Sequence, residues 1–107
     1  MKRVGFILKV REDLIEDYKD LHMDVWPEMK QALKKSGWHN YSLFMSKNGM
    51  IFGYFEATKS FYDSLKNMNK EEINSKWQNF MSPYFEIPET ATPDQSMIEL
   101  EEVFHLD

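Results

Sequence analysis

The feature that most constrains the fold is a pair of apolar-rich runs in the middle of the chain, residues 40–46 and 50–57, which are separated by only three residues. Those residues are Lys47, Asn48 and Gly49. Asn-Gly is a strong short-range signal for a β-hairpin, because both residues tolerate the positive φ angles that tight hairpin turns require. The two runs are therefore predicted to be antiparallel strands at the centre of the chain.

Before this hairpin, one extended and two helical patterns follow each other. Residues 2–10 alternate with a period of two, which indicates a strand, and apolar residues within 12–25 recur at three- and four-residue spacing, which indicates a helix. Pro27 disfavours helical geometry at the residue before it and suits a first helical turn. A second helix is therefore predicted from Pro27 to Lys35, and Gly37 is predicted to end it.

After the hairpin, helices are predicted over residues 60–68 and 70–81, then a looser segment with prolines over 83–93, then a closing strand over 97–106. The order β-α-β-β-α-β predicts an α+β protein with a ferredoxin-like split βαβ fold, in which helices cover one face of an antiparallel sheet. Both strand faces are apolar, so the second face needs a cover. A second copy packed sheet to sheet would give a homodimer with a dimeric α+β barrel.

Length and composition narrow the function classes. With 107 residues and 42% hydrophobic content, the chain is expected to form one domain over residues 1–107. It has no cysteine, so disulfides and thiolate chemistry are excluded and a cytoplasmic location is expected. No run approaches the ~20 apolar residues of a membrane span. The net charge of −5, with scattered basic residues, disfavours a nucleic-acid partner.

The densest cluster of candidate functional residues is Tyr18, His22 and Trp26, at four-residue spacing. If the helix continues to Trp26, all three side chains project from one face. An imidazole can give and take a proton near neutral pH, and a tyrosine one turn away can hydrogen-bond a sugar hydroxyl or orient the ring. The alternative is a core histidine packed among aromatic residues.

Two further clusters could take part in a site. Asn40 and Tyr41 stand where a helix passes into a strand, so their polar groups could face a cavity; alternatively, Asn40 satisfies the turn and Tyr41 is an ordinary strand residue. Trp77 and Gln78 lie on a predicted helix, where the tryptophan could stack on the apolar face of a sugar or simply fill the core.

Other site types find little support in the sequence. The three histidines show neither i, i+4 pairing nor HExxH spacing, so no metal site is predicted, although His105 stands near two glutamates. The four glycines form no phosphate-binding motif, and no nucleophile-elbow motif is present.

Taken together, the clusters resemble the L-rhamnose mutarotase family over nearly the whole chain. The matching segments are YKDLHMDVWPEM, GWHNYSLF, FGYFEA, KWQNFM and ELEEVFHLD. The resemblance implies a dimeric α+β barrel and an isomerase without cofactors that interconverts the α and β anomers of L-rhamnopyranose. It implies that His22 is the proton donor and that Tyr18 and Tyr41 bind the substrate.

The chain departs from some relatives at one place. Where those relatives carry two adjacent tryptophans that touch the sugar, this chain reads Lys76-Trp77-Gln78. An alignment on Phe80 and Met81 puts Trp77 at the first position and Gln78 at the second. A shift by one residue would bring Lys76 to the site instead.

Two other functions remain open from the residues alone. A cofactor-independent or haem-degrading monooxygenase could use the same dimeric barrel for an aromatic substrate. A non-enzymatic sugar-binding or sensor module would use the aromatic clusters for structure only.

Overall fold

The computed structural model describes residues 1–87 and 92–107. Residues 88–91, part of the predicted loop over 83–93, lie outside the described residues. The elements in chain order are β1 (Lys2–Lys9), the 3₁₀ helix η1 (Glu12–Leu14), α1 (Ile15–His22), α2 (Pro27–Lys35), β2 (Trp38–Met45), β3 (Met50–Ala57), α3 (Phe61–Met68), α4 (Glu72–Met81), the 3₁₀ helix η2 (Ser82–Tyr84), α5 (Pro93–Ser96) and β4 (Ile98–Leu100).

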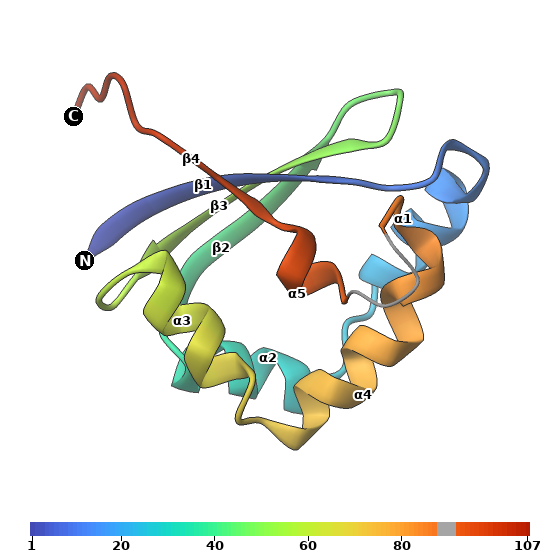
Figure 1. Cartoon of the computed structure of the whole chain (residues 1–107), viewed down its shortest axis with the longest axis horizontal. Helices are drawn as coiled ribbons and strands as arrows, with labels where there is room; N and C mark the ends of the chain where they lie inside the picture. Colours follow the sequence, from blue (N-terminus) through green and yellow to red (C-terminus); the bar gives the residue numbers. More distant parts are fainter. Residues whose placement is uncertain (88–91) are drawn as a thin grey trace.

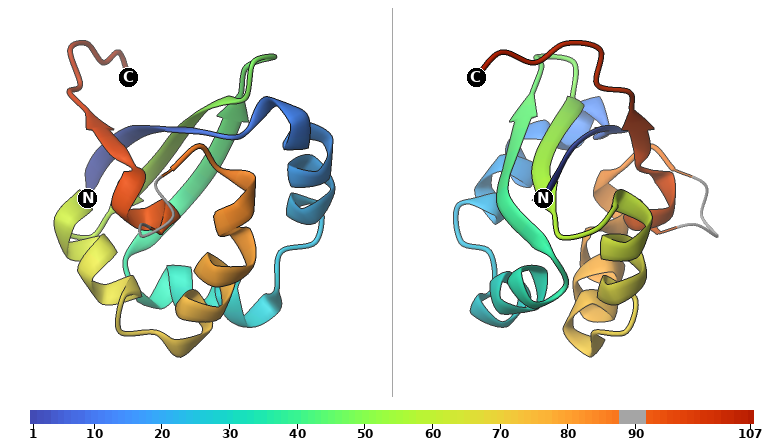
Figure 2. Two further views of the ribbon diagram at one scale, coloured as in Figure 1. Left: turned by 45° about the vertical axis from the view of Figure 1, so that its right-hand side comes forward. Right: turned by 90° about the vertical axis from the view of Figure 1, so that its left-hand side faces the viewer.

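The strands form one antiparallel sheet in the order β2-β3-β1-β4. Helices α2, α3 and α4 lie on one side of this sheet (Figures 1 and 2). This arrangement confirms the predicted α+β, ferredoxin-like fold. The predicted hairpin joins β2 to β3, and Gly49 in its turn has a φ of 88°. A Cβ atom there would lie 2.6 Å from the carbonyl oxygen of Val10, so the turn requires glycine.

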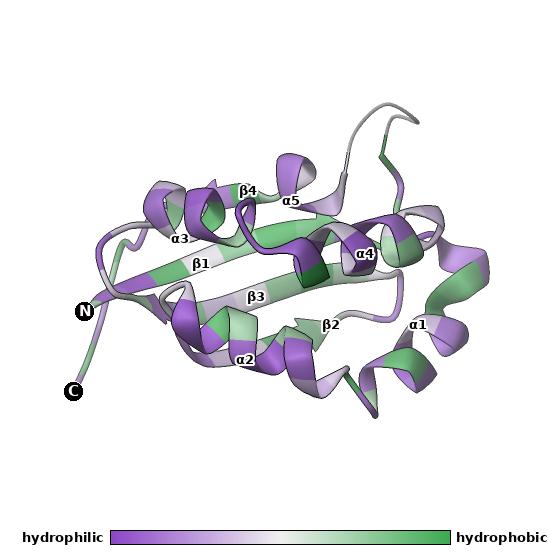
Figure 3. Cartoon of the chain, turned by 90° about the horizontal axis from the view of Figure 1, so that it is seen from below, coloured by the Kyte–Doolittle hydropathy of each residue, from purple (hydrophilic) through white to green (hydrophobic). Residues whose placement is uncertain are grey.

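The core lies between the sheet and these helices. Alternate residues of β1, among them Val4, Phe6 and Leu8, are buried in it. On β2, the Trp38 ring stacks on Phe55 with 4.0 Å between ring centroids. Its Nε1 donates to a backbone carbonyl of α3 over 3.1 Å, so its polar atom is satisfied. Figure 3 shows the helices alternating between hydrophilic and hydrophobic residues, as helices that cover a core do.

The predicted helix over residues 12–25 is shorter than expected. It begins as the 3₁₀ helix η1, continues as α1 and ends at His22. Trp26 instead precedes α2 as its N-cap, with an extended ψ of 133°. Proline at the next position disfavours helical geometry at Trp26, which accounts for the break. His22 and Trp26 therefore do not share a helical face.

The closing strand is also shorter than predicted. Of the range 97–106, only β4 (Ile98–Leu100) pairs with β1, and residues 101–107 form no strand. The register pairs Gly5 with Leu100, so Glu102 lies opposite Arg3, where the two side chains form an ion pair at 2.7 Å. On its other side β1 remains paired with β3 as far as Lys2, so β4 ends before β1 does.

The second face of the sheet carries exposed apolar side chains. Phe44 is 62% exposed, Phe52 is 44% exposed and Ile98 is 61% exposed. These side chains, on the face of the sheet opposite the helices, are therefore available to pack against another surface.

Within the described residues, no helix has the length and apolar character needed to cross a membrane.

Candidate active site

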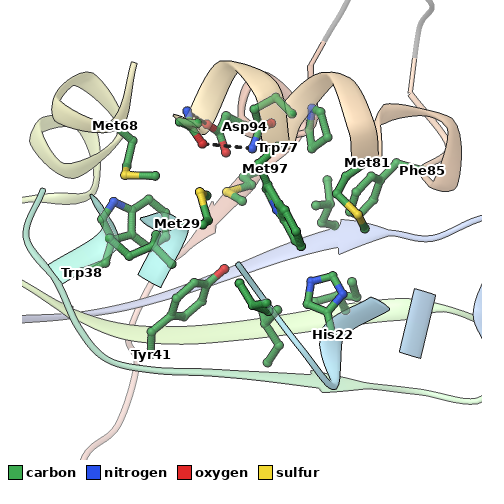
Figure 4. A pocket seen from close by; sticks show the side chains of 18 of the residues that line it. His22, Met29, Trp38, Tyr41, Met68, Trp77, Met81, Phe85, Asp94 and Met97 are labelled. Atoms are coloured by element: carbon green, nitrogen blue, oxygen red, sulfur yellow. Dashed lines mark hydrogen bonds between the residues drawn. The ribbon is translucent and has the colours of Figure 1, made fainter. Parts of the chain in front are cut away.

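A cavity of about 390 Å³ lies between the sheet and the helices, within the ~300–1,000 Å³ range of small-molecule sites (Figure 4). Apolar side chains make up most of its wall. The polar side chains that line it come from α1, α2, β2, α4 and α5, and they are Tyr18, His22, Lys30, Tyr41, Asn74, Gln78 and Asp94. An apolar cavity with a few convergent polar groups is typical of a site for a small organic molecule.

His22 is the last residue of α1, and its ring is fixed on two sides. The Tyr18 ring stacks on it at 4.1 Å between centroids, and Trp77 approaches edge-on at 5.7 Å. His22 Nδ1 lies 3.1 Å from the carbonyl oxygen of Tyr18. A carbonyl oxygen can only accept, so we assign the proton of the neutral ring to Nδ1. Nε2 then carries the lone pair, which makes it the basic atom of the ring.

The surroundings of His22 favour its neutral form. Burial lowers the pKa of the imidazole, and the hydrogen bond to the Tyr18 carbonyl offsets part of this effect. A neutral imidazole beside an apolar cavity can accept a proton at Nε2 and return it later in a reaction cycle.

Two tyrosine hydroxyls belong to the same cavity. Burial raises the pKa of both Tyr18 and Tyr41, so both phenols stay protonated at neutral pH. The Tyr41 hydroxyl points into the cavity (Figure 4). Within the described residues, neither hydroxyl group takes part in a hydrogen bond. Both remain available to a ligand's hydroxyl groups.

Trp77 and Gln78 on α4 are both buried in the cavity wall, whereas Lys76 is exposed and does not line it. The side-chain amide of Gln78 makes hydrogen bonds to two other residues. Gln78 Oε1 accepts from the backbone N–H of Asp94 over 3.0 Å, and Nε2 donates to Asn74 Oδ1 over 3.3 Å. Gln78 therefore ties α5 to α4 in addition to lining the cavity.

Two of the expected site residues lie outside the cavity wall. Trp26 packs on Trp77 at 4.9 Å between ring centroids and supports it from behind. Asn40 is exposed, and its Nδ2 donates to Glu56 over 3.3 Å. The cause is a bulge between His39 and Ser42, where Asn40 has a φ of 49°. The bulge lets both Trp38 and Tyr41 face inward and turns Asn40 outward.

Sequence reasoning missed Asn74 and Asp94, which the structure brings to the cavity. Asp94 belongs to α5, a short helix between the looser segment predicted over 83–93 and the strand predicted over 97–106. A signal for this helix was present: Thr92 and Gln95 form a capping box around Pro93. Asn74 Nδ2 donates to Asp94 Oδ2 over 3.0 Å.

No group of three or more histidine, cysteine, aspartate or glutamate side chains suited to a metal ion occurs within residues 1–87 and 92–107. His105, in the C-terminal segment, lies 2.7 Å from Asp107 and away from the cavity.

Known proteins share this fold and this chain length. The L-rhamnose mutarotase family model matches residues 3–106. An L-rhamnose mutarotase of Oceanobacillus iheyensis is 40% identical and one of Bacillus subtilis is 37% identical, each over 108 residues and 100% of both chains. The crystal structure of an L-rhamnose mutarotase from Formosa agariphila superimposes with a TM-score of 0.79 at 30% identity, covering 100% of both chains. By sequence and by fold, this chain belongs to the L-rhamnose mutarotase family.

Proposed function

We propose that this chain interconverts the α and β anomers of L-rhamnopyranose, with His22 as a proton-transfer group. The observation that carries the proposal is the placement of His22: a neutral ring, fixed by Tyr18 and Trp77, in the wall of a cavity sized for a small molecule. Family membership supplies the reaction and the sugar.

The reaction needs only proton transfers. The O1–H proton leaves, its electron pair forms the C1=O1 bond, the C1–O5 bond breaks, and O5 takes a proton. Rotation about C1–C2 followed by the reverse steps gives the other anomer. His22 Nε2 can accept a proton in one half of this cycle, and the resulting imidazolium is the donor in the other half. One positioned acid or base contributes about 10²–10⁴-fold in rate.

The other residues of the cavity suit a deoxy sugar. The Trp77 ring offers an apolar surface to the C–H face of the pyranose ring, and the protonated Tyr18 and Tyr41 hydroxyls can donate to or accept from sugar hydroxyls. Gln78 contributes less than a second tryptophan would, because its amide is engaged with α5 and Asn74.

The enzyme is further proposed to be a cytoplasmic homodimer. The exposed Phe44, Phe52 and Ile98 on the outer face of the sheet support sheet-to-sheet packing of two copies. Light scattering at rising protein concentration is expected to give twice the monomer mass, also in high salt, because apolar burial is not screened. A monomer mass at all concentrations refutes the homodimer.

The activity is tested by saturation-transfer NMR with unlabelled L-rhamnose. The wild-type protein is expected to exchange saturation between the two anomeric protons much faster than buffer does. His22→Gln is expected to lose most of this exchange and remain folded, and Tyr18→Phe is expected to lose less because it keeps the ring that stacks on His22. His39→Gln is the matched control, since His39 bonds to Thr58 away from the cavity.

Three results would contradict this proposal. Sugar binding without exchange in the wild-type protein identifies a binding module instead of an enzyme. Full exchange by a folded His22→Gln variant removes His22 from the chemistry. A larger loss in Tyr18→Phe than in His22→Gln reverses the roles of the two residues.

A further inference from the structure

The carboxyl group of Asp94 is held firmly in the cavity wall by α4. Its backbone N–H donates to Gln78 Oε1 over 3.0 Å, its Oδ2 accepts from Asn74 Nδ2 over 3.0 Å, and these two amides are joined at 3.3 Å. Two buried amides thus fix both the backbone and the side chain of Asp94. A carboxyl group so positioned is not a mobile surface acid.

The same cavity joins Asp94 to His22. Both residues line it, Asp94 from α5 and His22 from α1 (Figure 4). The Tyr41 hydroxyl points into the same cavity (Figure 4). Of the two carboxyl oxygens of Asp94, Oδ2 accepts the hydrogen bond from Asn74, and Oδ1 accepts none from the residues that the structure describes. Oδ1 can therefore face a ligand.

We propose that Asp94 is the second proton-transfer group of this site, acting on one oxygen of the sugar hemiacetal while His22 acts on the other. This inference rests on the proposed anomer exchange and adds a residue to it. The two residues line the cavity from different elements, so they can reach two different oxygens of one sugar.

The protonation states of the pair fit this division of work. Burial raises the pKa of the Asp94 carboxyl, partly offset by the Asn74 hydrogen bond, while burial lowers the pKa of His22. Because Oδ2 accepts from Asn74, the proton of the neutral acid belongs on Oδ1. The other titratable groups described in the cavity wall are Lys30 on α2 and two tyrosines on α1 and β2 that burial keeps protonated. Burial therefore favours the neutral forms of both groups, the acid of Asp94 and the free base of His22, which are the forms that this step uses.

The step balances as follows. His22 Nε2 removes the O1–H proton, and the electrons of that bond form C1=O1. The C1–O5 bond breaks, and O5 takes the proton from Asp94 Oδ1. The products are the open-chain aldehyde, the imidazolium of His22 and the carboxylate of Asp94. After rotation about C1–C2, O5 attacks the other carbonyl face, its proton returns to Asp94, and His22 returns the first proton to O1.

The test compares Asp94→Asn with Asp24→Asn as a matched control. Asparagine keeps the size of the side chain, the backbone bond to Gln78 and an oxygen that can accept from Asn74, but it carries no transferable proton. Asp24 is exposed and does not line the cavity. NMR exchange at several L-rhamnose concentrations is expected to give kcat lowered by about 100-fold or more for Asp94→Asn, with KM within about threefold of wild type. The control is expected to match the wild type.

The pH profile of kcat separates a chemical role from a structural one. In the wild type, kcat is expected to fall at both low and high pH, because the step needs an unprotonated His22 Nε2 and a protonated Asp94 at the same time. Asp94→Asn and His22→Gln are each expected to lose one of the two limbs, and not the same one.

Several outcomes overturn the inference. A kcat near the wild-type value in a folded Asp94→Asn variant overturns it, and so does a pH profile of Asp94→Asn that keeps both limbs. If Asp94→Asn does not fold, the wild-type profile decides, because a profile with a single limb is incompatible with two proton-transfer groups. A wild-type protein that exchanges the anomers no faster than buffer refutes the proposed function, and this inference falls with it.

Discussion

Substitution of Gly53 by alanine tests how tightly the strand face beneath the cavity is packed. Gly53 on β3 pairs directly with Phe6 on β1, and an added Cβ atom would lie 2.2 Å from Phe6 Cζ. Carbon atoms in contact are normally about 3.5–4.0 Å apart, so the ring must move by more than ~1 Å. Phe6 is 0% exposed and its ring stacks on Phe61 at 5.8 Å, so the ring has no free space on that side and can move only toward the cavity that it lines.

The expected cost lies at the upper end of overpacking, about 3 kcal/mol. For a chain of this size, that corresponds to a fall in Tm of roughly 12–24 °C. Scanning calorimetry or thermal denaturation followed by circular dichroism measures it. Phe6 is part of the cavity wall, and unfolding removes this wall. The variant is therefore expected to lose anomer exchange at temperatures where it is partly unfolded.

A double-mutant cycle with Phe6→Leu isolates the steric effect. Leucine lacks the ring atoms that the new methyl group would meet, so Gly53→Ala is expected to cost less than ~1 kcal/mol in the Phe6→Leu background. Equal costs in both backgrounds, or a Tm for Gly53→Ala within a few degrees of wild type, would show that the pairing of this glycine with Phe6 is not what limits the packing.

Three other expectations follow from single interactions. Ser60→Ala removes the hydroxyl oxygen that accepts a hydrogen bond from a backbone N–H at the start of α3, over 3.0 Å. Denaturant unfolding is expected to show that the free energy of unfolding falls by about 1 kcal/mol. A change near zero would mean that water replaces the cap. Trp77→Ala is expected to weaken L-rhamnose binding in an NMR titration markedly, and Lys76→Ala to leave it unchanged because Lys76 is exposed; the opposite order would place Lys76 in the site. The folded-state pKa of His22 lies below its ordinary value, so the folded state binds fewer protons than the unfolded state below about pH 6.5, and stability falls on acidification through that value. Measured as Tm against pH, this fall is expected to be smaller in His22→Gln, and an unchanged slope would assign it to other groups.

The local patterns of the sequence predicted most of the fold. The Asn-Gly turn and the apolar runs on either side of it predicted the β2-β3 hairpin, and Pro27 predicted both the break after α1 and the start of α2. These features depend on φ and ψ preferences and on periodicity within a few residues, so they can be read without knowledge of the tertiary structure. The short β4 strand was harder to predict, because apolar residues continue past Leu100, where its pairing with β1 ends.

The sequence was less informative about the site. It singled out Tyr18, His22, Tyr41 and Trp77, which all line the cavity, because residues of one helical or strand face can be recognised by spacing. It also included Asn40, since nothing in the local pattern reveals the bulge that turns this residue outward.

By itself, then, the sequence determined the order of the elements and the inward face of α1, because both follow from the repeat of the backbone. Only the tertiary structure decided that Asp94 reaches the cavity. That outcome depends on amides of α4, 16 and 20 residues earlier in the chain, which bind the backbone and carboxyl group of a short helix. Contacts at such separations arise from how the elements pack together, and no periodicity along the chain encodes them.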